Sequence, residues 1–255
     1  MKTIKQLDET VERGDVCGIP MVSCGIEPVL CEMDQNIRTA RKPQWISITG
    51  TEAMYYALHQ KEHLHYIRNA SFSLCDGIGV VVAGMLKGWK ILRVPGPVFM
   101  LKCCEFGVEK GWRHFFYGGK QGVAGMLRDK LTTQFPGLIT AGVYSPPFRA
   151  LTEEEEAEIV ERISATQPDI VWVGLGLPKQ ERWIARHIAT VKAPWMIGVG
   201  AAFDFHAGTA KWAPPLIRRM ALEWLYRLAH EPRMLKRDLR CLAFLIHAAA
   251  RRGRA

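Results

Sequence analysis

The sequence lacks the segments that mark exported and membrane-spanning proteins. None of its apolar runs approaches the roughly 18 residues of a membrane-spanning helix, and the longest of them, Ile78–Leu86, is far shorter. The first residues contain no apolar stretch of the kind found in secretory signals. The seven cysteines are odd in number and include no C-x-x-C pair. We therefore expect an intracellular protein whose cysteines are reduced.

Several ligand-binding signatures are also missing. There is no Walker A sequence, and Lys179 stands where the G-x-G-x-x-G dinucleotide fingerprint would need its third glycine. The chain has no D-x-D pair of carboxylates, so a dedicated metal site is not expected. A soluble nucleotide-dependent oxidoreductase remains an alternative, although the missing fingerprint argues against it.

The sequence does contain enough apolar material for a full core, together with an uneven distribution of charge. The apolar fraction is 48% over 255 residues, and the net charge is +9. From Lys211 to Ala255 there are 11 Lys or Arg residues and 3 acidic ones, which gives +8 and leaves +1 for the rest. Such a segment suits nucleic acid, anionic lipid or a diphosphate group. A nucleic-acid-binding protein is thus a second alternative, which the nearly neutral remainder fits poorly.

Strand-like and helical patterns alternate along most of the chain. The expected strands are Trp45–Thr49, Ser71–Cys75, His114–Tyr117, Leu138–Val143, Ile170–Val173 and Trp195–Val199. This alternation predicts an α/β fold, with a Rossmann-like parallel sheet and helices on both faces. Residues 1–43 are expected to be irregular apart from short strands at Ile19–Ser23 and Pro28–Cys31.

A basic, aromatic and helical appendage is expected to follow the core. We place the α/β core at residues 1–200 and the appendage at residues 201–255, with helices at Pro214–Ala229 and Glu231–Ala250. The last helix gathers apolar residues on one face at 3.6-residue spacing. They are Leu235, Leu239, Leu242, Ala243 and Ile246. Packing against the core and contact with a membrane explain this face equally well.

Polar residues and glycines follow the carboxyl ends of predicted strands, where open α/β sheets bind ligands. Asp76 follows the strand Ser71–Cys75 and could act as a general base or as a helix N-cap. Gly118-Gly119 and Gly174-Leu-Gly176 each lead into a helix N-terminus, which favours a diphosphate. Ordinary strand–turn–helix connections are the alternative explanation for both.

Asp204 follows the last predicted strand, within Phe203-Asp204-Phe205. Its carboxylate could accept hydrogen bonds from a uracil or a ribose, or it could cap the next turn. The neighbouring His206 is expected to be structural.

Six sequence blocks between about Trp45 and Arg240 carry these features in order. They are Cys75-Asp-Gly-Ile-Gly79, Arg93-Val-Pro-Gly96, Tyr117-Gly-Gly-Lys120, Gly174-Leu-Gly-Leu-Pro-Lys-Gln-Glu181, Gly198-Val-Gly-Ala-Ala-Phe-Asp204 and Leu222-Glu-Trp-Leu-Tyr-Arg-Leu228. Together they resemble the WecG/TagA/CpsF glycosyltransferase family.

The resemblance implies an inverting enzyme that needs neither a metal nor another cofactor. Such an enzyme moves a hexose or N-acetylhexosamine from a UDP-sugar to a sugar carried on a polyprenyl diphosphate, in bacterial cell-surface or exopolysaccharide synthesis. It implies a cytoplasmic protein that lies peripherally on the inner face of the cell membrane, held to anionic lipid by its appendage. Nucleic acid is not an expected partner.

The resemblance also implies roles for individual residues. Asp76 would take the proton from the acceptor hydroxyl. The residues that would bind the donor are Thr49, Arg93, Gly118, Gly119, Gly176, Gln180, Glu181 and Asp204. The residues that would face the acceptor diphosphate or the membrane are Arg227, Arg233 and Arg237.

Two positions depart from the family pattern. The family usually has a T-x-N motif after the first predicted core strand, and Gly50 stands here where the Asn is expected. Thr49 or Thr51 could supply a hydroxyl at this place. Met234 replaces the arginine often found after Glu-Pro-x, although Arg233 is adjacent. These departures affect the identity of the sugar more than the class of reaction.

Overall fold

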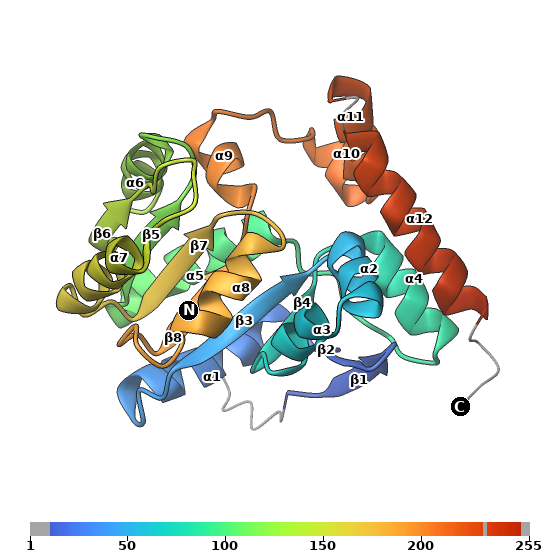
Figure 1. Ribbon diagram of the computed structural model, residues 1–255, viewed down its shortest axis with the longest axis horizontal. Helices are drawn as coiled ribbons and strands as arrows, with labels where there is room; N and C mark the ends of the chain where they lie inside the picture. The colour runs from blue at the N-terminus through green and yellow to red at the C-terminus, as the bar shows by residue number, and fades with distance from the viewer. Residues whose placement is uncertain (1–10, 232–233, 251–255) are drawn as a thin grey trace, which may run out of the picture.

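A computed structural model describes residues 11–231 and 234–250 of the protein (Figure 1). At its centre lies an eight-stranded sheet in the order β1-β2-β4-β3-β8-β7-β5-β6. The strands are β1 (Arg13–Val16), β2 (Ile19–Val22), β3 (Gln44–Thr49), β4 (Phe72–Cys75), β5 (Arg113–Gly118), β6 (Ile139–Tyr144), β7 (Ile170–Gly174) and β8 (Trp195–Gly198). All neighbouring strands are parallel except the antiparallel pair β1–β2. The predicted α/β fold with a mostly parallel sheet is confirmed.

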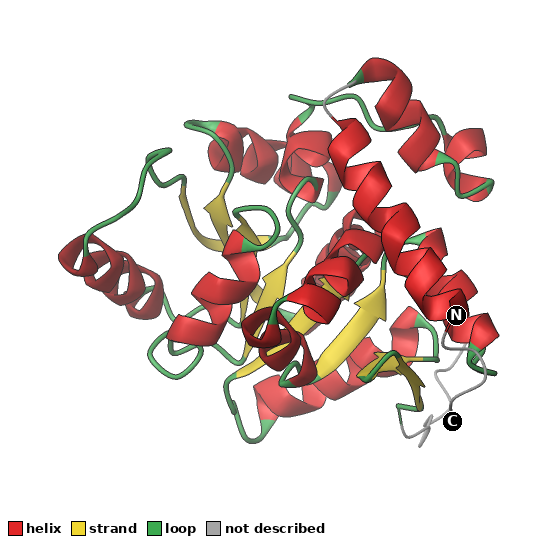
Figure 2. Ribbon diagram, turned by 45° about the vertical axis from the view of Figure 1, so that its right-hand side comes forward, coloured by secondary structure: helices red, strands yellow, loops and turns green. Residues whose placement is uncertain are grey.

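Helices cover both faces of this sheet and continue beyond it (Figures 1 and 2). They are α1 (Ile26–Arg38), α2 (Thr51–His59), α3 (Lys61–Arg68), α4 (Ile78–Leu86), α5 (Gly96–Lys110), α6 (Val123–Gln134), α7 (Glu153–Ala165), α8 (Lys179–His187), α9 (Ala202–Ala207), α10 (Pro215–Arg219), α11 (Glu223–His230) and α12 (Leu235–Ala250). Within the described parts of the chain, no helix combines the length and the apolar character needed to span a membrane.

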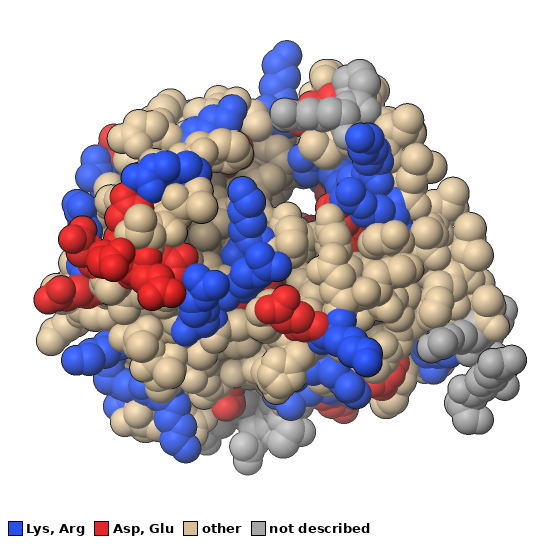
Figure 3. Space-filling view, in the orientation of Figure 1, with Lys and Arg blue, Asp and Glu red and all other residues tan. Residues whose placement is uncertain are grey.

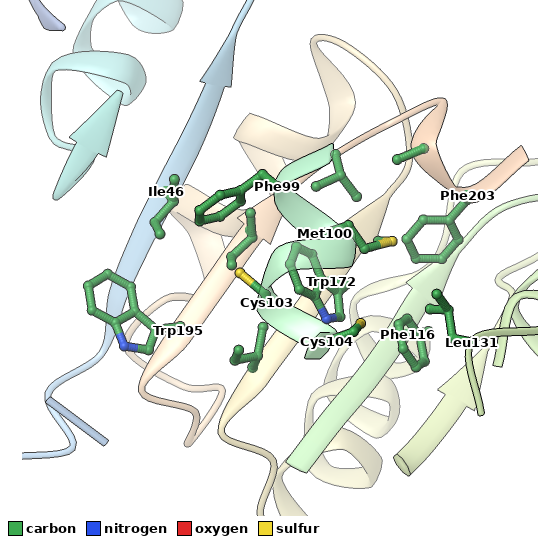
Figure 4. Packing of buried hydrophobic residues seen from close by; sticks show 14 of the residues in the cluster. Ile46, Phe99, Met100, Cys103, Cys104, Phe116, Leu131, Trp172, Trp195 and Phe203 are labelled. Carbon is green, nitrogen blue, oxygen red and sulfur yellow. The ribbon is translucent and has the colours of Figure 1, made fainter. Parts of the chain in front are cut away.

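The central strands are buried on both faces, which explains why their sequences are almost continuously apolar. Successive side chains of a strand point to opposite faces. In β7, Trp172 packs into a cluster with Phe99 and Cys103 of α5 (Figure 4). Its neighbours Val171 and Val173 pack on the other face, in a cluster that includes residues of α7 and α8.

The N-terminal region is more regular than the sequence suggested. The predicted strand at Pro28–Cys31 is wrong, because these residues lie in α1. Val29, Leu30, Met33 and Asn36 are buried along α1 at helical spacing, a period that a four-residue window cannot show. Pro28 is tolerated because it lies in the first turn, where backbone N–H groups have no partner within the helix. Residues 13–16 also form a strand that was not predicted.

The C-terminal helices α10, α11 and α12 extend beyond the sheet, as predicted. The single helix expected over Pro214–Ala229 is instead two, α10 and α11, and Ala221 between them has a left-handed φ of 57°. Helix α12 packs against α2 and α4. The division of the chain at residue 200 stays a prediction. We note that α9, just beyond it, packs against α5 and α6 and buries Phe203 in the core.

Candidate active site

The candidate site lies where the carboxyl ends of β3, β4, β5, β7 and β8 meet at one edge of the sheet. Parallel pairing brings together residues that are far apart in sequence. Thr49 lies opposite Cys75, which precedes Asp76, and Gly118 lies opposite Gly174. The sequence-based expectation that polar residues and glycines would collect at this edge is therefore met in space.

Asp76 is held by hydrogen bonds from three directions. Its backbone N–H donates to the carbonyl of Thr49 (3.2 Å), and its own carbonyl accepts from Nε of Arg93 (2.9 Å). Its carboxylate Oδ1 accepts from the backbone N–H of Gly96 (3.1 Å), the first residue of α5. The N-cap of the following helix α4 is Gly77, so the carboxylate does not cap its own helix. It lies instead at the positive N-terminal end of α5.

Burial raises the pKa of the Asp76 carboxyl above its usual value of 3.8. The hydrogen bond from Gly96 and the charges of Arg93 and Arg227 lower this pKa, while Glu223 raises it. Burial is the largest influence, so the group is a stronger base than an exposed aspartate. A carboxylate of raised pKa at the ligand-binding edge of an α/β sheet suits proton abstraction.

Two glycines after Asp76 let the N-terminus of α2 approach closely. A Cβ at Gly79 would lie 2.5 Å from Oγ1 of Thr51, and one at Gly77 would lie 3.0 Å from the same atom. At Gly50 there is more room, because a Cβ there would lie 3.7 Å from Oδ2 of Asp76. The position where the family pattern has Asn is therefore directly beside the candidate base.

Thr49 does not present its hydroxyl to this space. Its side chain is fully buried, and its Oγ1 lies 2.8 Å from Oγ of Ser47 in a hydrogen bond. What Thr49 contributes at Asp76 is its carbonyl oxygen. Thr51 is only half-buried and lies nearer to the Asp-Gly-Ile-Gly turn.

The glycine turns after β5 and β7 lie against each other. Gly118 has a φ of 129°, and a Cβ there would lie 2.6 Å from the carbonyl carbon of Gly174. A side chain at either strand end would thus collide with backbone or with Phe203. Gly176 has a φ of 76°, but a Cβ there would meet no atom within 4 Å. The backbone at Gly176 therefore borders open space, and a ligand can approach it closely.

Gln180 and Glu181 begin α8 as a buried polar pair beside this turn. Nε2 of Gln180 donates to Oε1 of Glu181 (3.0 Å), and the Gln180 amide packs on Gly198, where a Cβ would lie 2.9 Å from Nε2. Oε1 of Gln180 and Oε2 of Glu181 are buried and find no hydrogen-bond partner among the described residues. Burial raises the pKa of Glu181 to about 7. Buried polar atoms without partners are rare in folded proteins, and the expectation from the sequence that this pair binds a ligand stays a prediction.

Asp204 is already engaged within the protein. Its Oδ1 accepts from the hydroxyl of Thr209 (2.9 Å), and its carbonyl accepts from the backbone N–H groups of Thr209 and Ala210. Its side chain caps no helix, because the N-cap of α9 is Ala201 and lacks a side-chain cap hydrogen bond, and a role of Asp204 toward a nucleotide stays a prediction. His206 contacts the carbonyl of Pro97 (2.9 Å), in keeping with the structural role expected for it.

The C-terminal helices bring arginines toward Asp76. Arg227 is half-buried, and burial together with the charge of Arg237 lowers its pKa, while Asp76 acts in the opposite direction. Arg237 pairs with Asp238 (2.7 Å). Arg233 lies outside the described residues. Figure 3 shows a hollow beside a group of Lys and Arg side chains, between the sheet and the C-terminal helices.

Sequence reasoning missed two residues that organise this side of the site. Glu223 pairs with Arg93 (2.5 Å), and Arg218 accepts from the same guanidinium through its carbonyl (3.2 Å). The Arg218 guanidinium lies over the Trp212 ring at 3.7 Å. Arg218 and Glu223 follow Arg93 by 125 and 130 positions in the sequence. The only available signal was their place in or near the Leu222–Leu228 block.

Comparison with known proteins identifies the family. The model of the glycosyl transferase WecG/TagA/CpsF family matches residues 14–255. The chain belongs to the WecG/TagA/CpsF family of glycosyltransferases. This confirms the resemblance that six sequence blocks indicated. It replaces the two alternatives, an oxidoreductase and a nucleic-acid-binding protein.

Relatives of this WecG/TagA/CpsF glycosyltransferase include enzymes of Staphylococcus aureus strains NCTC 8325 / PS 47 and COL. Each is named N-acetylglucosaminyldiphosphoundecaprenol N-acetyl-beta-D-mannosaminyltransferase. Each is 30% identical over 204 residues, which cover 78% of this chain and 78% of the relative. The match extends over most of both chains, so the similarity is not confined to one motif.

Proposed function

We propose that this glycosyltransferase moves a hexose or N-acetylhexosamine residue from a UDP-sugar to a sugar on a polyprenyl diphosphate. The observation that carries the proposal is the position of Asp76, a base of raised pKa at the ligand-binding edge of the sheet, facing the arginine-bearing C-terminal helices. The names of the S. aureus relatives support an acceptor of the type N-acetylglucosaminyl-diphosphate-undecaprenol. The product would serve cell-surface or exopolysaccharide synthesis.

The donor is assigned to the glycine turns at β5 and β7. The backbone at Gly118, Gly119 and Gly176 allows close approach of a nucleotide diphosphate, and the N-terminus of α8 offers its partial positive charge to the leaving group. Oε1 of Gln180 is the acceptor left free for an N–H or O–H of the UDP-sugar. Arg93, Glu181 and Asp204 complete the donor-facing set that we propose, whereas Thr49, expected there from the sequence, acts only through its carbonyl bond to Asp76.

The reaction is a single displacement with inversion. The acceptor hydroxyl oxygen forms a bond to the anomeric carbon of the donor sugar, while the bond from that carbon to the diphosphate oxygen breaks. Asp76 receives the proton of the hydroxyl, and UDP leaves with the electron pair of the broken bond. We propose that α8 and nearby cationic side chains stabilise the leaving diphosphate in place of a metal ion.

The acceptor diphosphate is assigned to the arginines of the C-terminal helices. Arg227 lies near enough to both Asp76 and Arg237 for their charges to act on its pKa, and Arg233 joins the proposal although it lies outside the described residues. Arginine suits a diphosphate because its planar guanidinium can donate two hydrogen bonds to one phosphate. With an acceptor embedded in lipid, the enzyme would work peripherally on the inner face of the cell membrane.

A UDP-release assay tests the proposal. Purified protein is mixed with a panel of UDP-sugars and a short-chain lipid diphosphate that carries N-acetylglucosamine, with and without EDTA. We expect acceptor-dependent release of UDP that survives EDTA, and the active donor identifies the transferred sugar. Release that EDTA abolishes would overturn metal independence. Failure of every donor, together with no saturable UDP binding by calorimetry, would overturn the proposed reaction.

A further inference from the structure

The solvent-facing side of α4 is entirely apolar. This nine-residue helix, Ile78–Leu86, contains no charged or hydrogen-bonding side chain. Val80 and Ala83 on one side are buried in the core, whereas Ile78, Val82 and Met85 on the other are 41%, 39% and 68% exposed. A helix on the surface of a protein in water normally presents polar and charged residues on its outer side. The outer side of α4 is therefore suited to a nonaqueous neighbour.

The apolar surface continues past the end of the helix. Trp89 and Leu92 are both exposed, and the Trp89 ring lies so close over Gly14 of β1 that a Cβ there would be 2.5 Å from it. The ring is thus held in place rather than free to fold away. An exposed aromatic ring next to lysines, here Lys87 and Lys90, is typical of residues at a membrane–water interface.

A second apolar face lies beside the first, on α12. Phe244 and Ala248 of α12 are buried in one cluster with Val80 and Ala83 of α4, so the two helices are in contact. The residues of α12 that point outward are Leu235, Leu239, Leu242 and Ile246, each between 53% and 62% exposed. The side of α12 that packs against the core is therefore opposite to the apolar face that the sequence indicated. Figure 2 shows α12 running along the molecule in front of the sheet, and Figure 3 shows a broad uncharged area over this side.

We propose that α4, a helix of the α/β core, forms half of the lipid-binding surface, with α12 as the other half, and that its occupant is an anionic bilayer. This proposal rests on the proposed function, because a lipid-linked acceptor must reach Asp76 from a membrane. The exposed cations Lys236, in α12, and Lys90, just after α4, lie on these segments, and the one acid of α12, Asp238, is paired with Arg237. A net charge of +9 favours anionic lipid over a second copy of the same chain.

A bilayer bound to α4 would lie close to the catalytic base Asp76. Helix α4 begins two residues after Asp76, so a bilayer that receives Ile78 and Val82 lies directly beside the carboxylate. A diphosphate at the headgroup level would then meet Arg227, while the polyprenyl chain stays among the acyl chains. The core itself, and not only its C-terminal helices, would set the height of the active site above the membrane.

The test uses the full chain with Val82→Glu and Met85→Glu combined. Binding to vesicles of phosphatidylglycerol and phosphatidylcholine is measured by sedimentation, and we expect the double variant to bind about tenfold more weakly than the natural protein. The matched control is Met126→Glu, an exposed methionine on α6. It should bind vesicles like the natural protein. If the double variant binds vesicles normally, the proposal is overturned.

Two further readouts separate the possible outcomes. Transfer to a short-chain acceptor in solution should be unchanged in the double variant, while transfer to a long-chain acceptor in vesicles should fall with binding. If the natural protein transfers to neither acceptor, the proposed function fails, but vesicle binding still tests the surface. If the variant only converts a dimer to a monomer in sedimentation equilibrium, with vesicle binding intact, α4 is a protein interface and the proposal is wrong. Should the variant melt early by circular dichroism, Val82→Thr with Met85→Gln replaces it.

Discussion

The guanidinium of Arg93 and the carboxylate of Glu223 form an ion pair of 2.5 Å across 130 residues of sequence. The same guanidinium donates to the carbonyl of Asp76 in the core and to the carbonyl of Arg218 in α10. One side chain therefore joins the candidate base to the helices that carry Arg227. We expect the position of those helices over the site to depend on this contact.

Replacing Arg93 by Met should release α10 and α11 from the core. The pair is about four-fifths buried on each side, and removal of one partner leaves the other without compensation, at a local cost of roughly 1–3 kcal/mol. Hydrogen exchange should accelerate at residues 215–230 and stay unchanged in β3 and β7. The control is Arg128→Met, which removes a pair between exposed residues. Equal exchange in both variants would show that other contacts hold the helices.

Asp76→Asn should abolish most transfer while keeping the binding of UDP. The amide oxygen can still accept from Gly96, so the fold is preserved, but no proton can be taken up, and we expect a loss of roughly 10²–10⁴ in kcat. The raised pKa of Asp76 also predicts the pH profile of the natural enzyme. The base works only when ionised, so the rate should fall as pH drops through a value above that of an ordinary aspartate. Asp129→Asn, at an exposed position of α6, is the control, and full activity of Asp76→Asn would rule out the role.

Glu181→Gln should change how stability depends on pH. Burial raises the pKa of Glu181 from 4.5 to about 7, so the folded state holds a proton that the unfolded chain releases. This stabilisation is complete below pH 4.5 and is lost as pH rises through about 7. From pH 4.5 to 8, the natural protein should therefore lose up to roughly 3 kcal/mol relative to the always neutral variant. Urea unfolding at both pH values measures this difference, and Glu158→Gln, an exposed position, should show none.

Gly50→Asn should lower the pH at which the enzyme loses activity. Gly50 has an extended backbone that any residue adopts, and it is the N-cap of α2 without a side-chain cap. Asn there should add a few tenths of a kcal/mol of stability. Its amide would lie beside Oδ2 of Asp76, and a hydrogen bond to the ionised carboxylate lowers its pKa. Gly50→Ala fills the space without donating, so an equal shift in both variants would exclude the hydrogen bond as the cause.

The central part of the fold could be predicted because each strand is buried on both faces. Segments such as Ile170–Val173 are apolar at every position and end at glycine, which leaves little ambiguity. The edge of the sheet was harder. The buried positions of β1 are Gly14 and Val16, and of these only Val16 has an apolar side chain. The Trp89 ring covers Gly14 and leaves no room for a side chain there. The break at Ala221 depends on a left-handed backbone that alanine rarely adopts, so no local rule could reveal it.

In the candidate site, too, some residues could be predicted from the sequence and others could not. Asp76, Gly118 and Gly176 lie at or just past the carboxyl ends of β4, β5 and β7, and the rule that ligands bind at carboxyl ends of strands was sufficient to place them at one edge of the sheet. The contacts of Arg93 with Glu223 and Arg218 depend on how α10 and α11 return to the core. The sequence contains no periodicity that specifies this return. By contrast, the hydrogen bond between the hydroxyls of Thr49 and Ser47 joins two residues on one face of β3, which the two-residue period of a strand does indicate.

The docking of α12 has a consequence for how the protein is made. Arg240 donates to Glu52 from 188 residues further along the chain, and Phe244 fills the cluster formed by α2 and α4. These contacts can form only after residues 240–248 have left the ribosome. Until then, the part of the core that receives Phe244 stays uncovered on the growing chain. The core and α12 can therefore join only after α12 has been synthesised, and a chain that stops short of α12 exposes apolar surface that invites aggregation.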